Sequence, residues 1–233
     1  MRWINIKKEG SVGLMTMDYE EENHFDRPFV TELYEALDEI EADDEIKSIV
    51  VTGGTEKYWC TGLYLQYMMK LDPKDLVEYI RFFNNMLGRW CVFPKPVVAA
   101  INGHAFAAGA ILAAHTDFRF MREDRGWVCV PEVDINIPFL PGMISIFEQC
   151  LAPGAWREMA LTGKRYTAPE AKALGFIDEV YEKDELVPKS IEYAGFLATK
   201  NLAAYAEIKR RMRAETYRKI VEEDPKYLGG GTK

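Results

Sequence analysis

The feature that most restricts the fold of this chain is a buried strand that leads into a glycine turn and a run of very small residues. Residues 97–101 read Val-Val-Ala-Ala-Ile, an apolar run typical of a strand buried on both faces. Asn102-Gly103 marks a turn, and residues 105–110 read Ala-Phe-Ala-Ala-Gly-Ala. We expect a helix from Ala108 to His115. Side chains this small allow another segment, or a ligand, to approach the backbone where that helix begins.

A second apolar segment carries two acidic side chains. Residues 130–135 read Val-Pro-Glu-Val-Asp-Ile. Apolar surroundings disfavour a charged carboxylate, so we expect the pKa of Glu132 to be raised, which suits a group that accepts and returns a proton. If the segment is extended, the Asp134 side chain points to the same side as that of Glu132. A structural role, such as capping a nearby turn, is the alternative for Asp134.

The hydrophobic periodicity along the chain predicts an α/β protein. Strands are expected at residues 3–6, 12–17, 46–52, 97–101, 118–122, 126–130 and 176–181. Helices are expected at residues 28–40, 75–91, 108–115, 143–151, 155–161, 169–174, 185–200 and 203–222. Residues 229–233, Gly-Gly-Gly-Thr-Lys, are expected to form a flexible tail.

The composition excludes several classes of protein. The chain has 233 residues, of which 48% are hydrophobic, and a net charge of −8 at pH 7. This acidic balance gives no electrostatic footprint for nucleic acid or an anionic membrane, although a local basic patch could still bind a phosphorylated ligand. We expect no membrane span and no signal peptide. The four cysteines and three histidines lack metal-ligand spacing, so we expect reduced thiols, an intracellular protein and no metal site.

Four segments of the chain carry a recognisable pattern. They are residues 49–53 (Ile-Val-Val-Thr-Gly), 60–65 (Cys-Thr-Gly-Leu-Tyr-Leu), 101–105 (Ile-Asn-Gly-His-Ala) and 161–168 (Leu-Thr-Gly-Lys-Arg-Tyr-Thr-Ala). In this order and spacing they resemble the crotonase (enoyl-CoA hydratase/isomerase) superfamily. The segment from Asn102 to Ile135 is most similar to the plant-type Δ3,Δ2-enoyl-CoA isomerases.

The resemblance implies a crotonase-like spiral of ββα units with a helical C-terminal region. The spiral would form a core over residues 1–190, and residues 191–233 would lie at the subunit contacts of a homotrimer or hexamer. The substrate would be an acyl-CoA thioester, with no cofactor beyond the coenzyme A that the substrate itself carries. A cytoplasmic location is expected, because the C-terminal Gly-Thr-Lys differs from the peroxisomal Ser-Lys-Leu signal.

The resemblance also implies where the thioester binds. The backbone N–H groups of Leu63 and Ala108 would form an oxyanion hole for the thioester oxygen. Substrate would be bound by Ala108 and by the loop that contains Leu63, which consists of Thr61, Gly62, Leu63, Tyr64 and Leu65. Tyr64 departs from the aspartate that is common in the family, which leaves backbone contacts as the expected interactions there.

One carboxylate is kept and one is absent relative to the hydratases that the chain resembles. Glu132 stands at one of the two hydratase positions, and Ile111 stands at the other. A single carboxylate suits an isomerase, in which Glu132 moves a proton from C2 to C4 of a 3-enoyl-CoA. Leu140 stands where a dienoyl-CoA isomerase would carry a further acid. The alternatives are another crotonase-type reaction, by a hydratase or hydrolase, and a non-catalytic acyl-CoA-binding protein.

Other polar residues give weaker indications. We expect His104 to pack or to form a hydrogen bond rather than act as a base. His115 precedes Asp117, which matches a structural acid of the family. The basic residues 209–213 either meet the coenzyme A phosphates or form a solvated face, and the same two interpretations apply to Lys57.

Overall fold

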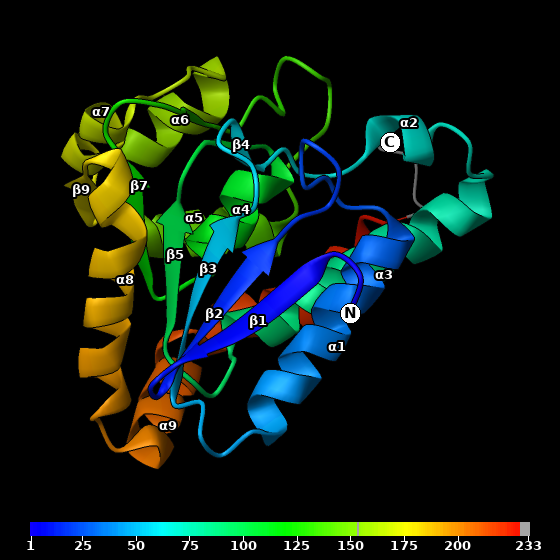
Figure 1. Ribbon diagram of the computed structural model, residues 1–233. Coiled ribbons are helices and arrows are strands. Elements are labelled where there is room, and N and C mark those ends of the chain that lie inside the picture. Colours follow the sequence, from blue (N-terminus) through cyan, green and yellow to red (C-terminus); the bar gives the residue numbers. More distant parts are fainter. Residues whose placement is uncertain (153, 229–233) are drawn as a thin grey trace.

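The computed structural model describes residues 1–152 and 154–228 and contains two β-sheets surrounded by helices (Figure 1). The larger sheet has six strands, with β1 antiparallel to β2 and the others parallel. The smaller sheet has three parallel strands. In sheet order, the larger sheet is β1 (Ile4–Glu9), β2 (Val12–Met17), β3 (Ser48–Gly53), β5 (Val97–Ile101), β7 (Phe118–Arg122) and β9 (Glu179–Tyr181). The smaller sheet is β4 (Tyr58–Cys60), β6 (His104–Phe106) and β8 (Val128–Cys129).

The central part of the chain repeats one unit of two strands and a helix. Each unit places its first strand in the larger sheet and its second strand in the smaller sheet, and then forms a helix. The units are β3-β4-α3 (Pro73–Cys91), β5-β6-α4 (Ala108–Ala114) and β7-β8-α5 (Pro141–Cys150), with the short α2 (Leu65–Met68) before α3. This is the expected spiral of ββα units. Because the smaller sheet is parallel, its strands all end at the same edge, and the segments that follow them lie close together.

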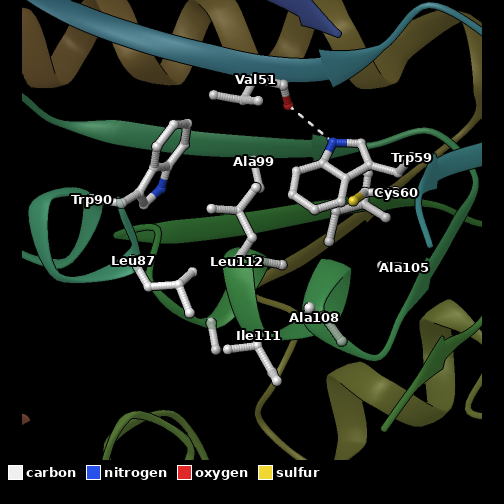
Figure 2. Packing of buried hydrophobic residues seen from close by; sticks show 14 of the residues in the cluster. Val51, Trp59, Cys60, Leu87, Trp90, Ala99, Ala105, Ala108, Ile111 and Leu112 are labelled. Carbon is white, nitrogen blue, oxygen red and sulfur yellow. Dashed lines mark hydrogen bonds between the residues drawn. The ribbon is translucent and has the colours of Figure 1, made fainter. Parts of the chain in front are cut away.

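Helices cover both faces of the larger sheet. Figure 1 shows α8 (Lys183–Ala198) along one side, with α1 (Arg27–Ala42) and α3 on the other. The central strands β3 and β5 are buried on both faces, so alternate residues enter different cores: Val50 packs in the cluster beneath α8, and Val51 packs in the main core. Figure 2 shows Trp59 of the smaller sheet donating a hydrogen bond of 3.3 Å from Nε1 to the backbone oxygen of Val51. This bond links the two sheets through the main core.

The C-terminal region differs from the continuous helix expected over residues 203–222. It forms α9 (Leu202–Met212), α10 (Ala214–Arg218), a π-helical turn (Lys219–Glu223) and a 3₁₀ turn (Asp224–Lys226). The helix is interrupted at Arg213, whose side chain turns inward onto Asp117 and several backbone oxygens. Hydrophobic periodicity does not report such a buried polar anchor. The expected boundary between residues 190 and 191 falls inside α8, and the division into a core and a C-terminal region stays a prediction.

Several expected elements differ in length. The strands expected at residues 126–130 and 176–181 are shorter, because Gly126 adopts a φ of +100° in a turn and Phe176 lies in a turn packed into the main core. The short strands β4 and β6 were not expected at all. Helices α6 (Ala155–Thr162) and α7 (Ala168–Ala173) are close to expectation. The predicted tail at residues 229–233 lies outside the described residues. In the described part of the chain, no helix is long and apolar enough to cross a membrane.

Candidate active site

A cavity of about 400 Å³ lies where the strands of the smaller sheet end. The segments that follow β4, β6 and β8 each contribute to its walls. Five residues predicted for the site line this cavity: Thr61, Leu63, Leu65, Ala108 and Glu132.

Gly62 and Tyr64 of the predicted loop do not line the cavity. Gly62 instead allows two backbone segments to approach each other. It has a φ of +89°, and a Cβ atom at this position would lie 2.6 Å from the backbone nitrogen of Ala108. The ring of Tyr64 stacks on that of His24, with 3.7 Å between the ring centroids.

Hydrogen bonds to Phe25 hold the loop around Leu63. The N–H of Phe25 donates to the oxygen of Gly62 over 2.7 Å, and the N–H of Tyr64 donates to the oxygen of Phe25 over 2.7 Å. Among the hydrogen bonds of the described residues, none uses the N–H of Leu63 or of Ala108. Leu63 and Ala108 both line the cavity. Because their N–H groups have no partner among these bonds, they are candidates for binding a ligand in the cavity.

The backbone is strained immediately before Ala108. Ala107 has a φ of +48° and a ψ of −125°, a region that residues with a Cβ atom rarely occupy. Helix α4 begins at the next residue, where the first N–H groups have no partner within the helix. Figure 2 shows Ala108 and Ile111 on α4. Such strain persists only where the surrounding structure holds the conformation in place, and it is concentrated at functional sites.

Glu132 is buried in this cavity, with a residue exposure of 5%. Its Oε2 atom has no hydrogen-bond partner within the described residues. Burial raises the pKa of Glu132 to about 7, because the apolar surroundings disfavour the charged carboxylate. A carboxyl group with this pKa can accept and donate a proton near neutral pH.

The possible pairing of Asp134 with Glu132 is not observed. Residues 132–136 form a turn instead of an extended segment, and the N–H groups of Asp134 and Ile135 both donate to the oxygen of Pro131. The Asp134 carboxylate lies against Gly163 and does not line the cavity. Glu132 is thus the one carboxylate among the described lining residues, while Ile111 and Leu140 present apolar side chains to the same space.

Two members of the basic cluster at residues 209–213 are structural. Lys209 is 5% exposed and donates to the backbone oxygens of Phe93 and Lys95, each over 2.8 Å, while its Nζ lies 2.6 Å from Asp117 Oδ2. Arg213 also pairs with Asp117, at 3.2 Å. Both sequence interpretations, phosphate binding and a solvated face, are therefore wrong for Lys209 and Arg213.

The other two arginines of the cluster remain on the surface. Arg210 and Arg211 are exposed and pair with Glu207. For these two, exposure agrees with a solvated basic face, and contact with the coenzyme A phosphates stays a prediction.

The histidines near the site have packing or structural roles. His104 stacks on Phe106, and its Nδ1 accepts a hydrogen bond of 3.2 Å from the N–H of Trp127. His115 is buried, and burial lowers its pKa to about 3. Asp117 accepts a hydrogen bond of 2.9 Å from the N–H of Val97 at the start of β5, as expected for a structural acid. Within the described residues, no group of three or more His, Cys, Asp or Glu side chains is arranged to hold a metal ion.

Sequence reasoning missed part of the cavity wall. Ile80 of α3 lines the cavity, and the helix pattern at residues 75–91 did not single it out as a residue of the site. Tyr227 and Leu228 were not singled out, because two apolar residues in an irregular C-terminal segment carry no periodic signal. The strain at Ala107 has no signature in the sequence either, because alanine normally avoids positive φ.

The repeated ββα units, and a cavity lined by Leu63, Ala108 and the buried carboxylate of Glu132, define a protein of the crotonase class. A model of the enoyl-CoA hydratase/isomerase family matches residues 7–224. The chain therefore belongs to the enoyl-CoA hydratase/isomerase family, whose members act on enoyl-CoA thioesters.

Individual relatives include proteins with different reactions. The chain is 28% identical over 223 residues to enoyl-CoA delta isomerase 3 of Arabidopsis thaliana, which covers 92% of this chain and 94% of that protein. It is 28% identical over 228 residues to a carnitinyl-CoA dehydratase of Salmonella agona, which covers 98% and 86%. A crystal structure of a probable enoyl-CoA hydratase from Mycobacterium tuberculosis matches with a TM-score of 0.88 at 26% identity, covering 94% and 92%.

Proposed function

We propose that this protein is a Δ3,Δ2-enoyl-CoA isomerase that converts 3-enoyl-CoA into trans-2-enoyl-CoA. The observation that carries the proposal is the buried carboxylate of Glu132, the one carboxylate that the described part of the chain places in a cavity that Leu63 and Ala108 also line. The similarity to a plant enoyl-CoA isomerase supports it.

In the proposed reaction, one carboxylate moves one proton. Glu132 removes a proton from C2, and the electron pair of the C–H bond delocalises over the thioester oxygen and the former C3–C4 double bond. Glu132 then returns the proton to C4, which leaves the double bond between C2 and C3. The pKa of about 7 suits both half-reactions, because the group can exist in either form near neutral pH.

The two N–H groups would stabilise the anionic intermediate. Negative charge develops on the thioester oxygen when C2 loses its proton, and fixed donors aimed at that oxygen need no reorganisation. Removing one such donor typically raises the barrier by roughly 3 kcal/mol. Leu63 and Ala108 are suited to this role, because their N–H groups have no other partner among the described residues.

Ile111 argues against a hydratase. Addition of water requires a water molecule to be held and activated, and an aliphatic side chain does neither. Ile111 presents such a side chain to the cavity beside Ala108, and Leu140 adds a further apolar group. Among the described residues, the cavity therefore offers one acid–base group, which is sufficient for moving a proton within the substrate.

The experiment compares two substrates with the purified protein. We expect 3-hexenoyl-CoA to be converted into the conjugated 2-enoyl thioester, followed by its ultraviolet absorbance. With crotonyl-CoA, we expect no water addition above the level of the Glu132→Gln variant.

Two outcomes would contradict the proposal. Rapid hydration of crotonyl-CoA would favour a hydratase, a reaction class related to the dehydratase that the chain also resembles. Tight binding of coenzyme A thioesters without turnover of any enoyl-CoA would favour a non-catalytic binding protein.

A further inference from the structure

One buried carboxylate ties the C-terminal end of the described chain to the core. Asp224 is fully buried. Its Oδ1 accepts a hydrogen bond of 2.8 Å from the N–H of Gly142, and its Oδ2 accepts one of 2.8 Å from Nδ2 of Asn84. Gly142 lies in the first turn of α5 and Asn84 lies in α3, so a single side chain joins three elements.

The local backbone is adapted to this contact. The π-helical turn at Lys219–Glu223 brings the chain against α5. A Cβ atom at position 142 would clash with the side chain of Ile220 and would lie 2.8 Å from Oδ2 of Asp224. Only a glycine at position 142 permits this approach. Insertions of π-helix are frequent at functional sites, so the segment that follows this turn is a candidate for a functional role.

The anchored segment leads directly into the wall of the substrate cavity. Tyr227 and Leu228 follow Asp224 by three and four residues, and both line the cavity. The elements that hold Asp224 line it too, through Ile80 of α3 and Met143 of α5. The anchor and this part of the wall therefore belong to one packed unit.

We propose that Tyr227 and Leu228 set the acyl-chain length that the cavity accepts, and that Asp224 is the positioning residue that holds them there. The inference rests on the proposed function in assuming that the acyl chain of an enoyl-CoA occupies this cavity. Tyr227 is 64% exposed and Leu228 is half-buried, and the N–H of Tyr227 donates a hydrogen bond of 3.0 Å to the backbone oxygen of Asp224. The anchor therefore holds the start of this wall, and acyl chains longer than the space allows would clash with it.

The anchor uses a carboxylate because both of its partners are donors. An ionised aspartate offers an acceptor oxygen to each donor, whereas an asparagine offers one acceptor and one NH₂ group. Asp224→Asn does not break the anchor cleanly, because Oδ1 of Asn84, which has no partner among the described residues, can turn to accept from the new amide. Asp224→Leu has a similar branched shape and no acceptor, so it leaves both donors without a partner. Exchanging the two side chains in the double variant Asn84→Asp/Asp224→Asn keeps an acceptor for each donor between these residues.

The first test measures binding of saturated acyl-CoA thioesters with acyl chains of increasing length, by titration calorimetry. We expect Tyr227→Ala and Leu228→Ala to raise the affinity for long chains relative to short ones by roughly tenfold. Tyr217→Ala and Leu161→Ala are the matched controls, because both side chains are exposed and neither lines the cavity. A uniform change of affinity across all chain lengths, or no change, would overturn the inference.

The second test addresses the anchor. We expect Asp224→Leu to shift the chain-length preference in the same direction as Tyr227→Ala, and the double variant Asn84→Asp/Asp224→Asn to keep the wild-type preference. A loss of stability in Asp224→Leu without a shift in preference would show that the residue has only a structural role and would overturn its assignment.

These tests are independent of catalysis. Binding of saturated thioesters is measured without turnover, so a protein without isomerase activity can still show the predicted length dependence. If isomerase activity is absent and the length dependence is present, only the proposed reaction fails. If isomerase activity is present and the length dependence is absent, only the inference about the C-terminal wall fails.

Discussion

At the scale of single residues, Glu132 is held in an environment that costs stability. Its pKa rises from 4.5 to about 7 on folding, because the carboxyl group is buried without a hydrogen-bond partner for Oε2. A group with a raised pKa destabilises the fold once the unfolded chain has lost the proton that the folded chain retains. Catalytic groups often have such perturbed pKa values, since the environment that a reaction needs is seldom the most stable one.

The Glu132→Gln variant is expected to be more stable than the wild type at alkaline pH. Below the unfolded pKa of 4.5 both states of the wild type are protonated and the cost is absent. The cost grows as the pH rises toward the folded value of about 7 and is constant above it. It amounts to about 3 kcal/mol at most, which Glu132→Gln removes. Urea unfolding at about pH 8 and about pH 4 measures the difference; a variant no more stable than the wild type at the higher pH would contradict the assignment.

Gly62 matters because it lacks a Cβ atom, which lets its backbone approach that of Ala108. In Gly62→Ala, the new Cβ would lie 2.6 Å from the nitrogen of Ala108, and alanine disfavours the φ of +89°. We expect the two N–H groups to be displaced and kcat/KM to fall by roughly 10²-fold or more, with substrate affinity changed much less. The alanine substitution Gly10→Ala is the control, because Gly10 has a φ of +63° with open space around it. Equal effects of the two substitutions on kcat/KM would contradict the role of Gly62.

At the scale of elements, the sequence predicted the components of the site better than their conformations. The apolar strand at residues 97–101, the following turn and the start of α4 at Ala108 were all predicted, because strand and helix patterns change sharply there. The strands β4 and β6 were missed, because they have three residues each and such short runs do not show an alternating pattern.

Asp134 shows a different limit of sequence reasoning. An extended segment and a turn are both compatible with Val-Pro-Glu-Val-Asp-Ile, and the acceptance of two N–H groups by the Pro131 oxygen selects the turn. That hydrogen bonding depends on how the segment meets the neighbouring elements. The sequence therefore identified Glu132 correctly as a residue of the cavity and left the position of Asp134 undetermined.

Helix α9 is attached to the core through the buried cluster of Asp117, Lys209 and Arg213. We expect Asp117→Asn to lower the free energy of unfolding by about 3 kcal/mol, because it leaves the buried Lys209 and the partly buried Arg213 without their counter-ion. Glu207→Gln removes a carboxylate from an exposed ion pair on the same helix and should change stability by less than about 1 kcal/mol. Denaturant unfolding at neutral pH measures both, and similar losses in the two variants would contradict the structural role of the cluster.

At the scale of the whole molecule, the fold and the family follow from the order of the segments. Four short motifs predicted the crotonase spiral, and the repeated ββα units and the family match confirm it. The three units share no obvious sequence repeat, so the spiral was accessible only through the family resemblance. The trimeric or hexameric state, the subunit contacts of the C-terminal region, the cytoplasmic location and phosphate binding at Lys57 stay predictions.

The C-terminal segment shows how distant parts of the chain combine in the whole molecule. Asp224 meets Asn84 and Gly142 across long stretches of sequence. No local pattern predicts that arrangement, because it arises when α3, α5 and the C-terminal turns pack together. The places of Glu132, Leu63 and Ala108 in the cavity wall could be predicted from a resemblance, whereas the contribution of Tyr227 and Leu228 required the structure.

The most direct test of the account is the rate of 3-hexenoyl-CoA isomerisation by Glu132→Gln compared with that of the wild type. The assay is best performed at about pH 8, where the wild-type carboxylate is ionised. Glutamine retains the shape of the side chain but cannot take a proton, so the account predicts that kcat falls by roughly 10³-fold or more while coenzyme A thioesters still bind. Turnover by Glu132→Gln at a rate close to that of the wild type would contradict the assignment of Glu132 as the group that moves the proton.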